Sequence, residues 1–208
     1  MVLIKNKNTK MNLPNLISLF RFVLAFITLG LIISFPISSS IVHITFILTI
    51  ISFLGDYLDG FFARKLKLST ELGAWLDIAA DRSVEMGYLI VFAYLHWLSP
   101  WIALIFLVRG IFVDGIRAFA QKKGYTAFGE KTMMQNPLGQ FLVSSHFVRG
   151  IYGIVKVLTF LIIILSQEYV ALKLTGLVLA YISTVFCLIR GIPVIIEGLR
   201  FFRDNENG

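Results

Sequence analysis

The chain has 208 residues, of which 57% are hydrophobic and only 15% are charged, with a formal net charge of +7. This composition excludes an ordinary soluble domain, because long polar stretches are almost lacking and a helix crosses a membrane with about 20 apolar residues. Cys187 is the only cysteine, so internal disulfides and cysteine-based metal clusters are excluded as well. We therefore expect an all-α protein with one integral membrane domain over residues 1–208.

The chain begins with a short basic segment, residues 1–12, which contains Lys5, Lys7 and Lys10. A secretory signal peptide would show small residues at a cleavage site after a compact apolar core, and this segment shows none. We therefore expect it to stay on the protein. Pro14 follows and suits the first turn of a helix, where its missing N–H costs no hydrogen bond.

Six apolar segments are long enough to cross a membrane. They cover residues 15–35, 41–62, 71–98, 101–120, 137–165 and 170–189. The polar breaks between them alternate, since every second break carries lysine or arginine and the others carry neither. Under the positive-inside rule, this alternation predicts a polytopic bundle of six transmembrane helices with both termini in the cytoplasm.

The basic loops also bear on binding partners. They lie next to the predicted membrane surface, where anionic lipid headgroups attract lysine and arginine. The positive net charge therefore predicts contact with membrane lipids and does not require a nucleic-acid partner.

The stretch from Asp56 to Asp81 carries the strongest functional pattern of the chain. Residues three or four apart share one face of a helix, so the first two aspartates point one way together, and so do the last two. A short loop at residues 65–70 would bring the two pairs face to face. Four convergent carboxylates need cations between them, and Mg²⁺ or Mn²⁺ prefers oxygen ligands of this kind. The full spacing is Asp56-x2-Asp59-Gly60-x2-Ala63-Arg64-x8-Gly73-x3-Asp77-x3-Asp81.

Other interpretations of these charges belong to different functional classes. A solvated acidic patch at helix ends does not require glycine, alanine and arginine at these offsets. A cation transporter would use intramembrane carboxylates, but it would also predict broken helices in related halves, which the sequence does not show. A silent scaffold that keeps the metal site is disfavoured by the complete aspartate set. Glu85, one turn beyond Asp81, is either a further partner of the metal site or a partner for a basic residue of another helix.

At every fixed position, the aspartate stretch resembles the signature of the CDP-alcohol phosphatidyltransferase family. The resemblance implies transfer of a phosphatidyl group from CDP-diacylglycerol to a small polar alcohol, with release of CMP. It implies two divalent ions, Mg²⁺ or Mn²⁺, held by Asp56, Asp59, Asp77 and Asp81, with Asp81 also the general base. It implies a donor site formed by Gly60, Ala63, Arg64 and Gly73, in which the small residues leave room and the arginine offsets diphosphate charge.

Two further stretches are similar to the phosphatidylglycerophosphate synthase subfamily, which favours sn-glycerol 3-phosphate as the acceptor. Inositol phosphate, inositol and phosphatidylglycerol remain alternative acceptors. The first stretch is Pro14, Asn15, Ser18 and Arg21, which is also similar to the start of CMP-forming cardiolipin synthases. The second is Lys131, Thr132 and Gln135. The candidates for holding the acceptor's phosphate are Arg109, Arg117, Lys131 and Arg149, although structural ion pairs such as Asp114 with Arg117 explain some of these charges equally well.

The same resemblance has implications for cellular location. It implies an integral protein of the bacterial inner membrane, with an active site that faces the cytoplasm. It is also compatible with a homodimer. No role follows from the sequence for His146 or Lys156.

Overall fold

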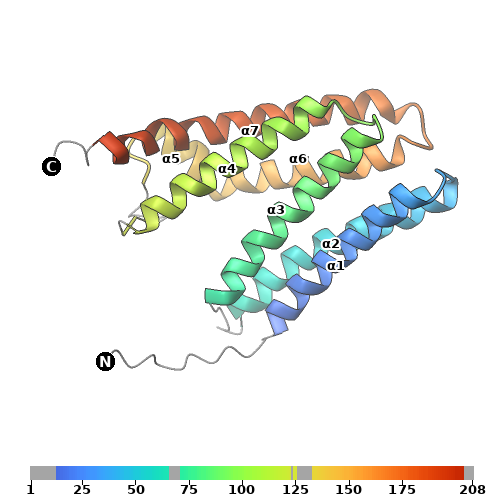
Figure 1. Cartoon of the computed structure of the whole chain (residues 1–208), viewed down its shortest axis with the longest axis horizontal. Coiled ribbons are helices and arrows are strands. Elements are labelled where there is room, and N and C mark those ends of the chain that lie inside the picture. Colours follow the sequence, from blue (N-terminus) through green and yellow to red (C-terminus); the bar gives the residue numbers. More distant parts are fainter. Residues whose placement is uncertain (1–12, 66–70, 123, 126–132, 204–208) are drawn as a thin grey trace. The chain divides into compact units, whose positions relative to one another are not determined.

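The computed structural model describes residues 13–65, 71–122, 124–125 and 133–203, without the side chains of residues 13–14, 56–65, 71–72, 74 and 201–203. Every regular element within these ranges is an α-helix (Figure 1). The chain divides into two compact units, residues 1–87 and residues 88–208, and the boundary falls inside one helix. The predicted all-α class is therefore confirmed for the described part of the chain.

The first unit contains α1 (Leu13–Ser34), α2 (Ser39–Lys65) and the first part of α3 (Glu71–Tyr94). Helices α1 and α2 pack side by side along their length (Figure 1). The hydroxyl groups of their buried threonines donate hydrogen bonds to backbone carbonyl oxygens one turn earlier in the same helix. Thr28 donates to the Leu24 carbonyl oxygen at 2.8 Å, and Thr49 donates to the Thr45 carbonyl oxygen at 2.7 Å. Such bonds let polar residues lie inside an apolar helix pair without unsatisfied donors.

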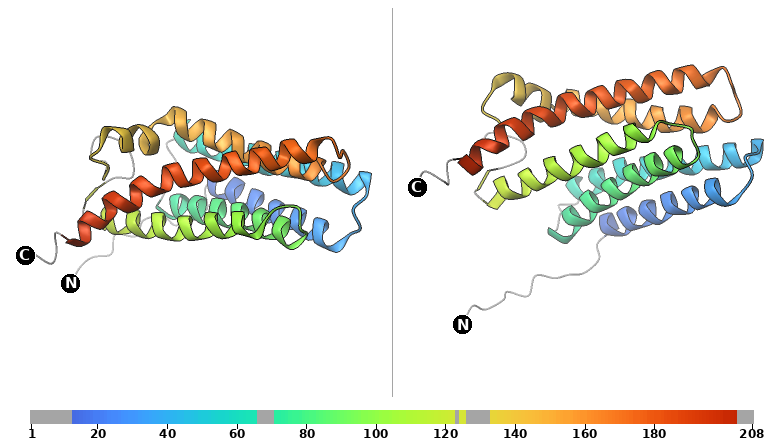
Figure 2. Two further views of the ribbon diagram at one scale, coloured as in Figure 1. Left: turned by 90° about the horizontal axis from the view of Figure 1, so that it is seen from above. Right: turned by 45° about the horizontal axis from the view of Figure 1, so that its top comes forward.

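The second unit contains the end of α3 and four further helices: α4 (Pro100–Lys122), α5 (Pro137–Ser144), α6 (His146–Leu165) and α7 (Leu172–Arg203). Helix α7 is central to it, because α4, α5 and α6 all pack against α7 (Figure 2). Near the α3–α4 turn, the ring of Tyr88 stacks on Phe160 at a centroid distance of 5.3 Å, and Phe92 meets the same Phe160 ring edge-on at 5.9 Å.

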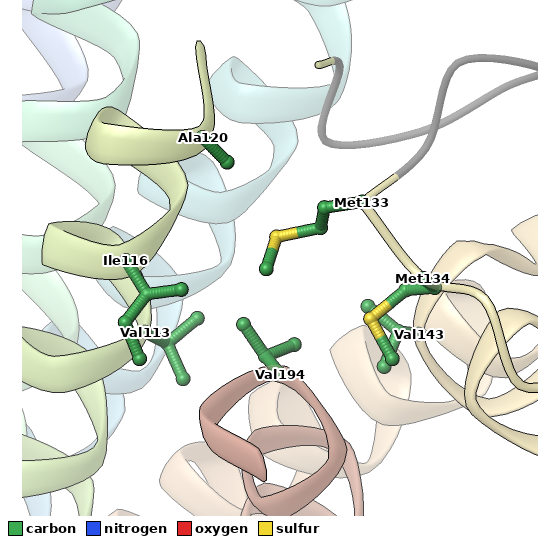
Figure 3. Packing of buried hydrophobic residues seen from close by; sticks show 7 residues of the cluster. All are labelled: Val113, Ile116, Ala120, Met133, Met134, Val143 and Val194. Carbon is green, nitrogen blue, oxygen red and sulfur yellow. The ribbon is translucent and has the colours of Figure 1, made fainter. Parts of the chain in front are cut away.

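A second buried cluster lies at the other end of α4. It joins α4, α5, α7 and the segment before α5, as Figure 3 shows for its side chains. Burial of these side chains helps to hold α5 and its preceding segment onto α7. The members are Val113, Ile116, Ala120, Met133, Met134, Val143 and Val194.

Three described helices are long and apolar enough to cross a membrane: residues 15–34 of α1, all of α6, and residues 172–200 of α7. The predicted fifth span, residues 137–165, proves to be two helices. The break lies at Ser145, which has an extended backbone with φ −60° and ψ 127°. The predicted sixth span was too short, because α7 runs on from residue 189 to Arg203.

Candidate active site

The second half of the aspartate motif lies on α3, where Asp77 and Asp81 are one turn apart. Both carboxylates bind the same side chain, Arg21 of α1. Arg21 Nη2 donates to Asp77 Oδ1 at 2.8 Å, and Arg21 Nη1 donates to Asp81 Oδ1 at 2.8 Å. The predicted common face of these two aspartates is therefore confirmed. The positively charged guanidinium of Arg21 lies between their Oδ1 atoms.

The burial of these three side chains is unequal. The Arg21 side chain is only 3% exposed, whereas those of Asp77 and Asp81 are 48% and 51% exposed. Ser52 of α2 donates to the Arg21 carbonyl oxygen at 3.0 Å and fixes the backbone at this point. A buried guanidinium needs carboxylate partners because an uncompensated buried charge is costly. Arg21 therefore holds one oxygen of each aspartate in a defined place while the carboxylates stay accessible.

The other residues of the predicted metal and donor site lie at the end of α2 and the start of α3. Asp56, Asp59, Gly60, Ala63 and Arg64 belong to the end of α2, and their side chains lie outside the described residues. Gly73 lies in the first turn of α3 and is half-buried.

Among the described residues, Asp77 and Asp81 are the predicted metal ligands whose side chains can be compared with the needs of a divalent ion. Within the described ranges, no three His, Cys, Asp or Glu side chains gather as they would around a metal ion. Asp77 and Asp81 provide two convergent, accessible carboxylates, and this hard-oxygen donor set fits Mg²⁺ or Mn²⁺. These two residues thus fit the role of two of the four carboxylate ligands in the predicted metal site.

Glu85 has a basic partner on its own helix. It is buried, and its Oε2 accepts from Arg82 Nη1 at 3.0 Å, an ion pair between residues three apart on the same helix. The Arg82–Glu85 pair offsets charge within α3 itself.

The second unit gathers three arginines from three helices. Arg109 of α4 is buried, and its side chain passes across Gly191 of α7, where a Cβ atom would lie only 2.6 Å from Arg109 Cγ. Arg190 of α7 is also buried, and the charges of Arg109 and Arg149 act on its guanidinium. A group of like charges inside a helical bundle is unfavourable unless an anion offsets it. Such a group is suited to binding a phosphate.

Arg190 was missed by the sequence analysis. The apolar run of the last span ends at Ile189, so the next residue reads as an ordinary interfacial arginine. In the structure, the Arg190 guanidinium lies over the Tyr152 ring at 5.1 Å, and Lys156 Nζ lies over the same ring at 5.5 Å. An arginine followed by Gly191, which admits close helix packing, is the one local signal that could have indicated burial.

The other predicted phosphate ligands are placed only in part. Arg117 is half-buried on α4, and Lys131 lies outside the described residues. Arg149, in the first turn of α6, contacts His146 Nδ1 through Nη2 at 2.6 Å. His146 thus has an arginine neighbour on its own helix.

Comparison with known proteins adds a family to this geometry. The profile of the family described as CDP-alcohol phosphatidyltransferase matches residues 11–189. Proteins named CDP-diacylglycerol–glycerol-3-phosphate 3-phosphatidyltransferase are similar to the chain in several bacteria. The one from Aquifex aeolicus is 31% identical over 177 residues, which cover 78% of this chain and 96% of that protein. The one from Wigglesworthia glossinidia brevipalpis is 29% identical over 161 residues, which cover 76% and 84%.

Proposed function

Because the chain belongs to the CDP-alcohol phosphatidyltransferase family, we propose that it transfers the phosphatidyl group of CDP-diacylglycerol to sn-glycerol 3-phosphate and releases CMP. The family match carries this proposal, and both relatives described above are named for this donor and this acceptor. The paired carboxylates of Asp77 and Asp81 support it, because they lie within the motif that the family uses.

The proposed metal site consists of Asp56, Asp59, Asp77 and Asp81 with two Mg²⁺ or Mn²⁺ ions. The family is generally dependent on divalent metal ions. Bound ions would supply positive charge that polarises the reacting phosphate and offsets the negative charge of the CMP leaving group. Asp77 and Asp81 would hold an ion next to Arg21, to which each carboxylate is bound through Oδ1.

We assign the chemical step to Asp81. The acceptor hydroxyl oxygen attacks the phosphorus that bears the diacylglycerol, Asp81 takes the hydroxyl proton, and the bond from that phosphorus to the CMP oxygen breaks. An alcohol has too high a pKa to ionise freely at neutral pH, so a carboxylate helps by accepting the proton as attack proceeds. Gly60, Ala63, Arg64 and Gly73 form the proposed donor site.

We assign the acceptor's phosphate to the arginine group of the second unit. Arg109 of α4 packs against Gly191, the neighbour of Arg190, and the charges of Arg109 and Arg149 both act on Arg190. Arg117 and Lys131 are further candidates from the sequence. A phosphate dianion would offset their mutual repulsion with charge-assisted hydrogen bonds. A neutral acceptor such as inositol would give the arginines no such counter-charge.

The experiment that tests the proposed function supplies purified protein with CDP-diacylglycerol and one acceptor at a time. The acceptors are sn-glycerol 3-phosphate, inositol phosphate, inositol and phosphatidylglycerol, each with and without excess EDTA. We expect CMP release with glycerol 3-phosphate and its loss in EDTA. CMP release with another acceptor alone would overturn the acceptor assignment, and full activity in EDTA would overturn the metal site.

Replacing Arg190 by alanine is expected to raise the KM for glycerol 3-phosphate about 10- to 100-fold, because a charged hydrogen bond contributes roughly 1.5–3 kcal/mol. The KM for CDP-diacylglycerol should stay nearly constant. Lys173→Ala, which removes an exposed charge from the first turn of α7, is the matched control. Arg190 also contacts backbone carbonyls of α5, so thermal unfolding is measured on the same samples. Equal rises in both KM values would refute the phosphate assignment.

We further propose that residues 1–208 form one membrane domain with six spans, both termini in the cytoplasm, in a bacterial inner membrane. The family match runs from residue 11 to residue 189 and so covers parts of both units, which supports a single domain. After Cys187→Ser, an impermeant thiol reagent added outside the cell should label Ser38→Cys and spare Lys67→Cys. The reverse pattern would invert the proposed topology.

A further inference from the structure

A buried carboxylate near the end of α7 has no place in the chemistry described so far. Glu197 is 6% exposed. Its Oε2 accepts a hydrogen bond from the backbone N–H of Gln135, and its Oε1 accepts one from the backbone N–H of Asn136 at 3.3 Å. Both oxygens of this side chain are therefore committed to the segment that enters α5.

The entry of α5 is a regular helix start. Asn136 is the N-cap, and its side-chain oxygen accepts from the Leu138 N–H at 3.0 Å. A carboxylate at this end is favourable because the first amides of a helix point outward unpaired and carry partial positive charge. Glu197 therefore stabilises the same helix end that Asn136 caps.

The opposite end of α5 is also held by α7. Arg190 donates to the Leu142 carbonyl oxygen at 3.3 Å and to the Val143 carbonyl oxygen at 3.4 Å. Arg190 and Glu197 are seven residues apart and hence share a face of α7. The carboxylate of Glu197 lies at the N-terminus of α5 and the guanidinium of Arg190 lies at its C-terminus. Each charge is therefore opposite in sign to the end of the helix dipole that it contacts, which stabilises α5.

Close packing leaves this segment little freedom to move. A Cβ atom on Gly139 would lie 2.8 Å from Glu197 Oε1 and 2.7 Å from Met134 Cε. Met134 is buried beside Val143 (Figure 3), and Gln140 Nε2 donates to the Met134 carbonyl oxygen at 2.9 Å. The start of α5 is thus fixed to α7 by hydrogen bonds on one side and by apolar contacts on the other.

We propose that Glu197 is a positioning residue for the acceptor site. It acts by fixing α5 between α7 and α6. Helix α6 begins directly after the break at Ser145, and Arg149 lies in its first turn. The position of α5 therefore sets where Arg149 lies relative to Arg190. Glu197 itself binds backbone amides and does not contact the phosphate, which its own charge would repel. This inference rests on the proposed function, because it takes the arginine group to be the acceptor site.

The test compares Glu197→Ala and Glu197→Gln with wild type in CMP release, titrating glycerol 3-phosphate and CDP-diacylglycerol separately. We expect Glu197→Ala to raise the KM for glycerol 3-phosphate about tenfold, as small misplacement of binding groups does, with the KM for CDP-diacylglycerol unchanged. Glu197→Gln keeps one acceptor oxygen and should show a smaller rise. Glu168→Gln, in the α6–α7 turn, is the matched control for loss of a carboxylate.

A double-mutant cycle separates positioning from general destabilisation. If Glu197 acts through Arg149, Glu197→Ala should have little further effect on the acceptor KM in an Arg149→Ala background. Additive effects, or an unchanged acceptor KM in Glu197→Ala, would overturn the inference. Should Glu197→Ala fail to fold, Glu197→Gln decides by the same cycle. Wild-type protein that releases no CMP with glycerol 3-phosphate would instead overturn the proposed function. If the wild-type enzyme is active and the Glu197 variants have the same acceptor KM as wild type, only this inference is overturned.

Discussion

Replacing Asp81 by asparagine is expected to lower kcat for CMP release about a thousandfold or more. General-base catalysis alone contributes roughly 10²–10⁴, and the substitution also removes a charge from the proposed metal site. The amide oxygen of asparagine can still accept the hydrogen bond that Arg21 donates to Oδ1. Asp77 also still pairs with Arg21 in this variant, so the protein should fold, and loss of activity should reflect chemistry.

The measurement is CMP release under saturating substrates, with Mn²⁺ titration and thermal unfolding on the same preparation. Glu168→Gln serves again as the control for a lost carboxylate outside the site. Asp81→Asn protein that keeps more than about a tenth of wild-type kcat would exclude Asp81 as the base, since the minimum contribution of such a group is larger.

Replacing Arg21 by glutamine is expected to lower the free energy of unfolding by about 2–3 kcal/mol in excess EDTA. Two charge-assisted hydrogen bonds are lost, and solvent screens both of them because the aspartate side chains are about half exposed. The double variant Asp77→Asn, Asp81→Asn should cost more. It leaves the charge of a guanidinium that is 3% exposed without these two carboxylate partners.

Reversible unfolding of the purified variants would measure these differences. The Arg21–Asp77 pair can be isolated in a double-mutant cycle, where we expect a coupling energy of at least about 1 kcal/mol. Glu85→Gln is a useful comparison, because it weakens an ion pair within α3 that does not involve α1. Additive effects of Arg21→Gln and Asp77→Asn would show that the contact contributes nothing to stability.

Much of the fold was predictable because membrane helices are marked by long apolar runs. The spans expected at 15–35 and 71–98 correspond to α1 and α3 within a few residues. The family was predictable too, because the aspartate motif has many fixed positions in a short stretch. The break at Ser145 was not, since both flanking segments are apolar and a single serine does not interrupt that pattern.

The residues that hold the sites together were harder to predict. Arg21 pairs with Asp77 and Asp81, which lie 56 and 60 positions further along the chain. Local periodicity gives no information on such distant contacts. Arg190 and Glu197 lie beyond the apolar run that defined the last span and beyond the matched family segment. Their roles depend on α5, whose separate existence the sequence did not reveal.

The burial of Arg21 has a consequence for biosynthesis. When α1 enters the membrane during translation, the aspartates of α3 that pair with its arginine have not yet been synthesised. An arginine inside a membrane helix costs up to roughly 2.5–3.5 kcal/mol on insertion scales, so α1 depends on its apolar residues to enter alone. Asp77 emerges from the ribosome 56 residues later. The ion pairs of Arg21 with Asp77 and Asp81 therefore form only after α3 has been synthesised, which makes the arrival of this helix the step that completes the charge pairing of α1.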